Sequence, residues 1–254
     1  MGSKTRGLVA RFGDLLTPKQ IFDRIYRINK IQLEKITTRL RCLSHSVNSV
    51  NSVQISSKAA LSICGSSFCK MKFIEAPLSG AYIIETEPSY DIRGSFGRVY
   101  SGREFREKGL EADLTEISIC HNLVAGTLRG MHYQRGKHAE TKLVRVIRGS
   151  IFDVIVDIRP ASPTYGKWFG GTLTPENGIA FYIPKGFAHG FLTLEDKTDV
   201  LYQISDTYDA QAATGFAWND PAIAIDWPGI PTVISPKDAL LPHLDQGDFS
   251  PYAE

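Results

Sequence analysis

Most of the chain alternates short apolar runs with turn residues. From Phe73 onward, runs rich in Val, Ile, Tyr and Phe are bounded by Gly, Pro, Asn or Asp, which is typical of β-strands. The pattern predicts strands over residues 80–87, 98–102, 114–122, 126–134, 141–159, 167–174, 178–184, 188–196 and 199–208. Gly149 interrupts the run 141–159 and predicts a hairpin turn there. Only residues 101–110 look helical, so the pattern favours an all-β sandwich or jelly-roll barrel, whose axial cavity is lined by alternate strand positions.

The first part of the chain has a different pattern. Residues 17–43 carry apolar side chains at helical spacing with Lys and Arg between them, which predicts an amphipathic helix. Thr17 is expected to cap this helix, Pro18 suits its first turn, and Gln20 completes a capping-box pattern. The Ser-rich residues that follow carry no strand signals, and we expect them to be flexible. The chain is therefore expected to consist of an extension, residues 1–70, and a β domain, residues 71–254.

Charge separates the same two parts, although the formal net charge of the whole chain is only +2. Residues 1–70 hold 12 of the 29 Lys and Arg and 3 of the 27 Asp and Glu, which gives +9, whereas the rest holds 17 and 24, which gives −7. Three interpretations are open for the basic extension: an organelle-targeting segment, a helix that touches a membrane surface or a partner, and upstream sequence translated from too early a start. The third is preferred, because Met71 begins a self-sufficient domain.

Composition sets further bounds. Hydrophobic residues make up 43% of the chain, which is enough for a substantial core. No apolar run approaches the roughly 18 residues of a membrane helix, so we expect a soluble protein without a membrane span. The cysteines Cys42, Cys64, Cys69 and Cys120 are not spaced like a zinc site and are interpreted as reduced thiols, as in the cytoplasm. No nucleic-acid partner is expected.

Two histidines draw attention to possible chemistry. His132 lies in the stretch GTLRGMHYQ, residues 126–134, three positions after Arg129. His189 lies in GIAFYIPKGFAHGF, residues 178–191, whose spacing resembles the second metal-binding motif of the cupin family. The first cupin motif, His-x-His with a nearby Glu, is absent. A catalytic metal usually takes three protein ligands. We therefore expect a cupin-type jelly-roll barrel with no metal and no cofactor, whose inward polar residues suit proton transfer.

Seven motifs in one order make the resemblance more specific. They are GTLRGMHYQ, KLVRVIRGSIFDVIVDIR, SPTYGKW, YIPKGFAHGF, WNDP, IDWP and SPKDALLP. Together they resemble the dTDP-4-dehydrorhamnose 3,5-epimerase family over about residues 73–246. The resemblance implies a 4-keto sugar nucleotide as substrate, with acidic C–H bonds at C3 and C5 beside the carbonyl. Inverting such a centre needs a base on one face and an acid on the other, and the enolate oxygen must be stabilised.

The resemblance also implies the catalytic roles. His132 would be the base, and Asp238 would orient its imidazole and stabilise the imidazolium. Tyr202 would be the acid on the opposite face of the sugar. Lys142 would lie beside the oxygen that carries the enolate charge.

Substrate-binding roles follow in the same way. Arg93 and Arg129 would bind the diphosphate, for which a forked guanidinium is well suited. His189 would lie near the sugar, supported by Asp153. The implied partners are the nucleotide-sugar substrate and a second copy of the chain in a homodimer, and the implied pathway is the biosynthesis of rhamnose for polysaccharide.

Each assignment has a structural alternative. Asp238 could cap a late turn, Tyr202 could be a wall residue, and Lys142 could be solvated. Arg93 could pair with a surface acid. These alternatives are open on the sequence alone.

The nucleotide side departs from the family pattern. A Gln-x-Asn-like pair is frequent where this chain has Glu116 and Ser118, Arg98 stands where some members have Glu, and Ala213 stands where some have a charged residue. We still assign Glu116 and Ser118 to the substrate-binding set. The preferred function is 3,5-epimerisation of dTDP-4-dehydro-6-deoxyglucose. A single-centre epimerase or isomerase of another keto-sugar nucleotide, and a non-catalytic sugar-binding cupin, are the alternatives.

Overall fold

The computed structural model of the chain describes residues 70–244. The predicted helix over residues 17–43 and the Ser-rich segment after it lie outside this range, so both stay predictions. The first described strand begins at Met71, where the β domain was expected to start.

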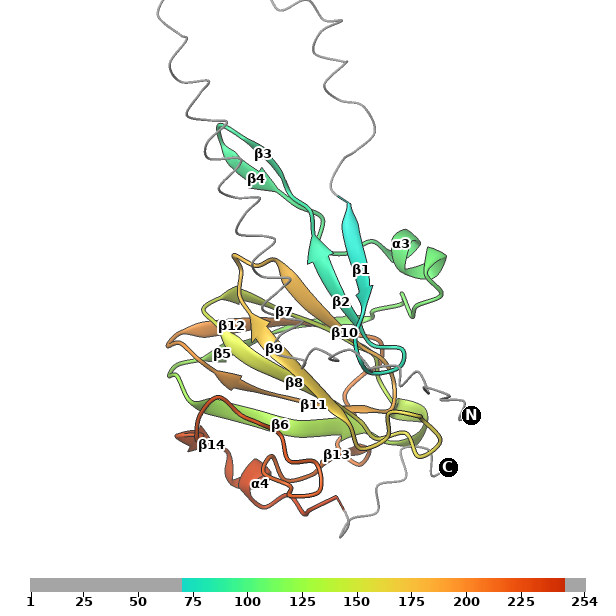
Figure 1. The fold of residues 1–254 in the computed structure, drawn as a ribbon, viewed down its shortest axis with the longest axis vertical. Coiled ribbons are helices and arrows are strands. Elements are labelled where there is room, and N and C mark those ends of the chain that lie inside the picture. Colours follow the sequence, from blue (N-terminus) through green and yellow to red (C-terminus); the bar gives the residue numbers. More distant parts are fainter. Residues whose placement is uncertain (1–69, 245–254) are drawn as a thin grey trace, which may run out of the picture.

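Two sheets face each other and form a jelly-roll barrel (Figure 1). The first sheet has the spatial order β1 (Met71–Glu75), β2 (Tyr82–Thr86), β10 (Ile179–Ile183), β7 (Lys142–Arg148), β12 (Thr198–Ile204) and β5 (Glu116–Asn122). The second has the order β13 (Ala213–Gly215), β6 (Thr127–Gln134), β11 (Phe187–Thr193), β8 (Ile151–Asp157) and β9 (Trp168–Leu173), with β14 (Val233–Ile234) paired to β6. The all-β prediction is therefore confirmed.

Five short elements complete the described chain. The strands β3 (Ser89–Asp91) and β4 (Gly94–Phe96) form a hairpin that extends away from the barrel in Figure 1. The helices are α3 (Gly102–Glu107), the 3-10 turn η1 (Gly136–His138) and α4 (Pro236–Ala239). None of the helices in residues 70–244 has the length and apolar character needed to cross a bilayer.

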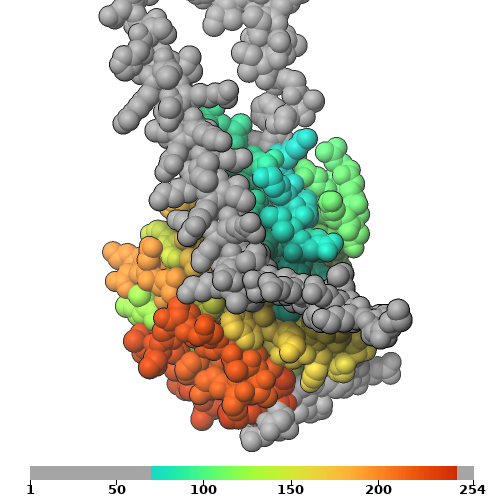
Figure 2. Space-filling view, viewed as in Figure 1, coloured from blue at the N-terminus to red at the C-terminus, as the bar shows by residue number. Residues whose placement is uncertain are grey.

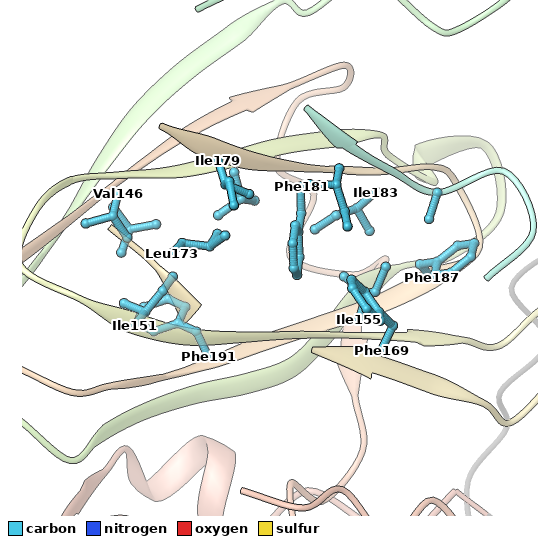
Figure 3. Close-up of a cluster of buried hydrophobic side chains, with 14 of the residues drawn as sticks. Val146, Ile151, Ile155, Phe169, Leu173, Ile179, Phe181, Ile183, Phe187 and Phe191 are labelled. Carbon is cyan, nitrogen blue, oxygen red and sulfur yellow. The ribbon is translucent and has the colours of Figure 1, made fainter. Parts of the chain in front are cut away.

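The main core lies between the two sheets. On β10, Ile179, Phe181 and Ile183 point into this core, whereas the intervening Ala180 and Tyr182 pack on the outer face. Figure 3 shows Phe181 pointing between the sheets toward Phe169, and the two ring centroids are 5.4 Å apart. Because β10 is buried on both faces, its sequence reads as a continuous apolar run rather than an alternating one.

A second core covers the outer face of the first sheet. Ser101 caps α3 by accepting a hydrogen bond from the backbone N–H of Glu104, as expected of a helix N-terminus. The fully buried Phe105 of α3 then packs against Tyr182 and Phe73. In Figure 2, α3 accordingly lies beside β1 and β2 on the surface of the domain. The prediction of a helix within residues 101–110 is confirmed.

Two predictions about local structure are wrong. Residues 98–102 do not form a strand: the Val99 carbonyl accepts from the side chain of Arg145 at 2.8 Å, and the Tyr100 hydroxyl donates to the Ala112 carbonyl. The turn at Gly149 is not a hairpin either. It joins β7 of the first sheet to β8 of the second, so the chain turns a corner of the barrel there.

Gly149 fits this corner for two reasons. Its φ of +77° lies in the left-handed region, and a Cβ at this position would stand 2.3 Å from the Thr198 hydroxyl oxygen. Gly109 has a similar φ of +71° but nothing within 4 Å of its Cβ position. A substitution at Gly109 therefore introduces backbone strain alone, whereas a substitution at Gly149 introduces strain and a steric clash.

We expect Gly149→Ala to destabilise the fold more than Gly109→Ala. Gly109→Ala should lower the free energy of unfolding by about 1–2 kcal/mol, the strain of a left-handed alanine. Gly149→Ala should add about 1–3 kcal/mol of overpacking at the barrel corner. Urea unfolding of both variants measures the difference, and equal losses would show that Thr198 yields at no cost.

Candidate active site

Beside the apolar core, the two sheets enclose a cavity of about 540 Å³. One wall comes from β6 and β11, the opposite wall from β5, β7 and β12, and β14 and α4 lie at its edge. The cavity is lined by His132, His189, Tyr202, Lys142, Asp238, Arg129 and Glu116, among others. Seven of the ten site residues predicted from the sequence therefore meet in one place.

A bulge in β6 explains how Arg129 and His132, three positions apart, reach the same cavity. In the pairing of β6 with β11, His132 is opposite His189 and Arg129 is opposite Phe191, so β6 holds one extra residue. Such a bulge breaks the alternation of strand side chains. Gly130 lies within it, with a φ of +139°, and a Cβ there would stand 2.5 Å from Gly190 Cα. Only glycine allows the two strands to approach this closely.

His132 and Asp238 form a hydrogen-bonded pair. Nε2 of His132 lies 2.8 Å from Oδ1 of Asp238, and the other carboxylate oxygen accepts from the backbone N–H of Gly130 at 3.3 Å. Burial disfavours the charged carboxylate, but these hydrogen bonds outweigh it and hold the pKa of Asp238 below its usual value. The backbone N–H of Asp238 donates to the hydroxyl of Ser235, the residue that caps α4. Asp238 therefore lies in the first turn of α4, and its carboxylate orients His132.

His189 and Asp153 form a second pair deeper in the barrel. Nε2 of His189 lies 2.7 Å from Oδ1 of Asp153, and both residues are buried. The second oxygen of Asp153 has no hydrogen-bond partner. Burial therefore raises the pKa of Asp153, and the nearby His189 only partly offsets it. The expected support of His189 by Asp153 is present in the geometry.

Tyr202 lies on β12, in the wall opposite the one that carries His132 and His189. It faces His189 across the cavity. The rings of Tyr202 and His189 meet edge to face, with centroids 5.7 Å apart. Burial, helped by the charge of Asp153, raises the pKa of Tyr202 well above its usual value. The phenol therefore keeps its proton at neutral pH and has one to give.

Lys142 is buried rather than solvated, with 8% of the residue exposed. Its Nζ lies 2.9 Å from Oε1 of Glu140, and it lines the cavity from the first position of β7. Arg129 is held by Asn122, whose Oδ1 accepts from Nε at 2.9 Å, so the rest of the guanidinium extends from β6 with its direction fixed.

Three of the predicted site residues do not line the cavity. Asp153 lies behind His189, and Ser118 is an exposed residue of β5 opposite Tyr202 in the strand register. Arg93 lies on the exposed β3–β4 hairpin and pairs with Asp91, with Nη2 2.5 Å from Oδ2. Within one chain, Arg93 therefore forms the surface ion pair that the sequence left open as an alternative.

Several residues that line the cavity were not predicted. They are Cys120, Gln134, Glu140, Tyr208 and Lys237. Lys237 precedes Asp238 in the same SPKDALLP stretch, so its proximity could have been inferred from the motif. Gln134 is the last residue of the GTLRGMHYQ stretch, so its proximity could also have been inferred. Cys120, Glu140 and Tyr208 depend on loops and on the register of β5, which local patterns do not reveal. Cys120 is a free thiol.

Within residues 70–244, no group of three or more His, Cys, Asp and Glu side chains is arranged to hold a metal ion. Each cavity histidine is bonded instead to one carboxylate. The arrangement offers a base, a neutral phenol and an ammonium around one space, which is a set suited to moving protons on a bound substrate.

Comparison with known proteins agrees with this geometry. The profile of the dTDP-4-dehydrorhamnose 3,5-epimerase family matches residues 75–246. An enzyme of that name from Methanothermobacter thermautotrophicus is 47% identical over 159 residues, which cover 63% of this chain and 85% of the relative.

Solved structures point the same way. The Legionella pneumophila epimerase, in complex with dTDP-4-keto-L-rhamnose, is 37% identical and superposes with a TM-score of 0.68 over 73% of this chain and all of that one. A 3'-monoepimerase from Streptomyces bikiniensis, in complex with dTDP-quinovose, is 29% identical, with a TM-score of 0.64 over 68% of this chain and 87% of that one. The seven ordered motifs, the barrel and the family profile together establish that this chain belongs to the dTDP-4-dehydrorhamnose 3,5-epimerase family, a family of carbohydrate isomerases.

Proposed function

We propose that this chain converts dTDP-4-dehydro-6-deoxyglucose to dTDP-4-dehydrorhamnose by proton transfer at C3 and C5, with no metal. The observation that carries the proposal is the placement of the His132–Asp238 pair and Tyr202 on opposite walls of one cavity. Inversion of a carbon centre requires a base and an acid on opposite faces of the sugar, and opposite sheets supply them here.

The base is a defined nitrogen of His132. Because Nε2 faces the charged Asp238, it carries the proton of the neutral ring, and Nδ1 is left with a lone pair. Nδ1 removes the proton beside the carbonyl, and the imidazolium that forms is stabilised by the carboxylate at 2.8 Å. Asp238, with its lowered pKa, remains charged throughout.

The acid and the enolate site come from the first sheet. Tyr202 donates its proton from β12 to the opposite face of the carbon, and Lys142 from β7 lies on the same wall to bind the enolate oxygen. A fixed ammonium in a site with little water stabilises this developing charge far more than it would in bulk solvent. Arg129 and Lys237, also in the cavity, supply positive charge for the diphosphate.

The partner proposed for this chain is a second copy of itself. The outer face of β5 and its neighbours exposes Ile117, Ile119 and Ile147, which are 66%, 49% and 44% exposed. Apolar side chains gathered on one sheet face favour an interface. Arg93 does not reach the cavity of its own chain, so its role at the diphosphate requires a second copy to bring the projecting hairpin over that cavity.

Ile119→Glu is expected to convert a dimer into a monomer. A buried charge without a partner opposes association. Sedimentation equilibrium of the full chain measures the mass of the wild type and the variant. A monomeric wild type would refute the homodimer and, with it, the role of Arg93.

A single-centre epimerase is the second candidate function. The likeness to the 3'-monoepimerase from Streptomyces bikiniensis favours it, since the same acid and base serve both reactions. The changed nucleotide side, with Glu116 in the cavity, is a further reason to test the substrate directly.

Proton exchange in deuterated water tests the function. With chelator-treated full-length protein and dTDP-4-dehydro-6-deoxyglucose, we expect the C3 and C5 proton signals to disappear from the NMR spectrum. His132→Ala should slow this exchange by about 10²–10⁴-fold, the usual contribution of a general base. His121→Ala is the matched control, because His121 forms a similar pair with Asp199 at 2.8 Å outside the cavity.

The outcomes separate the alternatives. Exchange at C3 alone would identify a single-centre epimerase. No exchange in the wild type would favour the non-catalytic sugar-binding protein, and full exchange in His132→Ala would remove His132 from the mechanism. Activity lost on chelation and restored by a metal would refute the metal-free reaction.

Tyr202 is expected to ionise at a higher pH than an exposed tyrosine. Burial raises its pKa, so Tyr202→Phe should leave the phenolate absorbance unchanged up to about pH 10, where exposed tyrosines titrate. Ultraviolet difference titration of the two proteins, with circular dichroism to verify folding, makes the comparison. One phenolate fewer in the variant at that pH would mean that Tyr202 titrates normally.

A further inference from the structure

Glu140 connects a proposed catalytic residue to the fold, and no role has so far been assigned to it. It lies just before β7, and its side chain is 11% exposed. Both carboxylate oxygens are used: Oε1 lies 2.9 Å from Lys142 Nζ, and Oε2 accepts from Gln134 Nε2 at 3.0 Å. Among the ion pairs of residues 70–244, Glu140 is the acidic partner of Lys142.

Gln134 is itself fixed at several points. Its Oε1 accepts from the backbone N–H of Asp209 at 2.7 Å, and its Nε2 also lies 3.1 Å from the carbonyl of Thr207. These two backbone groups flank Tyr208, which lines the cavity. A continuous chain of hydrogen bonds therefore runs from Lys142 through Glu140 and Gln134 to the loop that places Tyr208.

A lysine needs such a partner to act at a defined point. Its four-carbon stem carries about 2 kcal/mol of rotamer entropy, and its ammonium has three donors that can turn. A buried ammonium without an anion is also strongly disfavoured. Glu140 holds one donor of Lys142 on the side of the loop, which leaves the others for the cavity. The carboxylate can do this only because Gln134 prevents it from moving.

We propose that Glu140 is a positioning residue that fixes Lys142 Nζ where the enolate oxygen forms. This inference rests on the proposed function, since it concerns the group that stabilises the enolate. A misplacement of about 1 Å lowers catalysis by about 10²-fold. Because the enolate charge exists only after proton removal, the loss falls on kcat and not on the binding of the ground-state ketone.

The kinetic test compares Glu140→Ala with matched variants. Glu140→Ala should lower kcat by about 10²-fold and leave KM within about threefold. Glu140→Gln should also lower kcat, because Lys142 and Gln134 use different oxygens of the carboxylate and the amide NH2 would face one of these two donors. Glu107→Gln, the same change on the exposed face of α3, should leave kcat unchanged.

A double variant shows whether Glu140 acts through Lys142. If it does, Glu140→Ala adds no further loss on a Lys142→Ala background. Additive losses would mean that Glu140 acts by another route and would refute the proposal. A kcat of Glu140→Ala equal to that of the wild type, measured on protein shown to be folded, would refute it as well.

A spectroscopic readout tests the positioning without any turnover. In ¹⁵N-lysine-labelled protein, the wild type should show a protected Lys142 ammonium signal, assigned through its loss in Lys142→Arg, and Glu140→Ala should lose it. Persistence of the signal in Glu140→Ala would overturn the inference. If the wild type showed this signal but exchanged no C3 or C5 proton, the proposed function would fail while the positioning of Lys142 by Glu140 stood.

Discussion

The hydrogen bond between His132 and Asp238 joins residues 106 positions apart, and much of the C-terminal structure is needed to form it. Both β13 and β14 pair with β6, the strand that carries His132, and so bring the chain back to this edge of the sheet. Ser235 then caps the short α4 and fixes the backbone of Asp238. Gly215 allows the close approach, because a Cβ there would stand 2.1 Å from the Met131 carbonyl oxygen. Base and carboxylate therefore meet as a result of strand pairing rather than of local sequence.

The same arrangement occurs three times around the cavity. His132, His189 and Lys142 each face one carboxylate, at 2.8, 2.7 and 2.9 Å. The environments of these carboxylates differ. Asp238 accepts from His132 and from a backbone N–H, and its pKa is lowered, whereas fully buried Asp153 has an unpartnered oxygen and a raised pKa. The carboxylate of Asp238, beside His132, is therefore firmly charged. The carboxyl group of Asp153, near Tyr202, keeps a proton more readily.

The sequence is informative about strands and less so about what joins them. Continuous apolar runs such as β10 are visible in the pattern, because burial on both faces dictates them. The corner at Gly149 was mistaken for a hairpin, because a glycine with positive φ serves both a hairpin and a turn between two sheets. The strand predicted over residues 98–102 failed because Arg145, distant in sequence, takes up the Val99 carbonyl.

In the candidate site, too, the sequence indicates residues within local motifs but not residues whose position depends on distant parts of the chain. The resemblance to the family indicated His132, Asp238, Tyr202 and Lys142, and these four line one cavity. Glu140 is absent from the residues that the sequence indicated, because its proposed role depends on Gln134 and on the loop around Tyr208. Arg93 illustrates the opposite limit: its motif is local, and the structure places it on the exposed β3–β4 hairpin, away from the cavity of its own chain.

The position of the altered residues suggests why catalysis and nucleotide recognition can vary separately. His132 and Lys142, two of the proposed catalytic residues, each have a largely buried carboxylate partner that a replacement would leave without its partner. Glu116 and Ser118 lie on β5, which is an edge strand of the first sheet and, among the strands of residues 70–244, pairs with β12 alone. Its burial pattern is mostly exposed, so a change there leaves no cavity and strands no buried charge. Under the proposed function, sequence differences on β5 can therefore alter which nucleotide the cavity accepts, while the residues proposed to move protons keep their positions in the barrel.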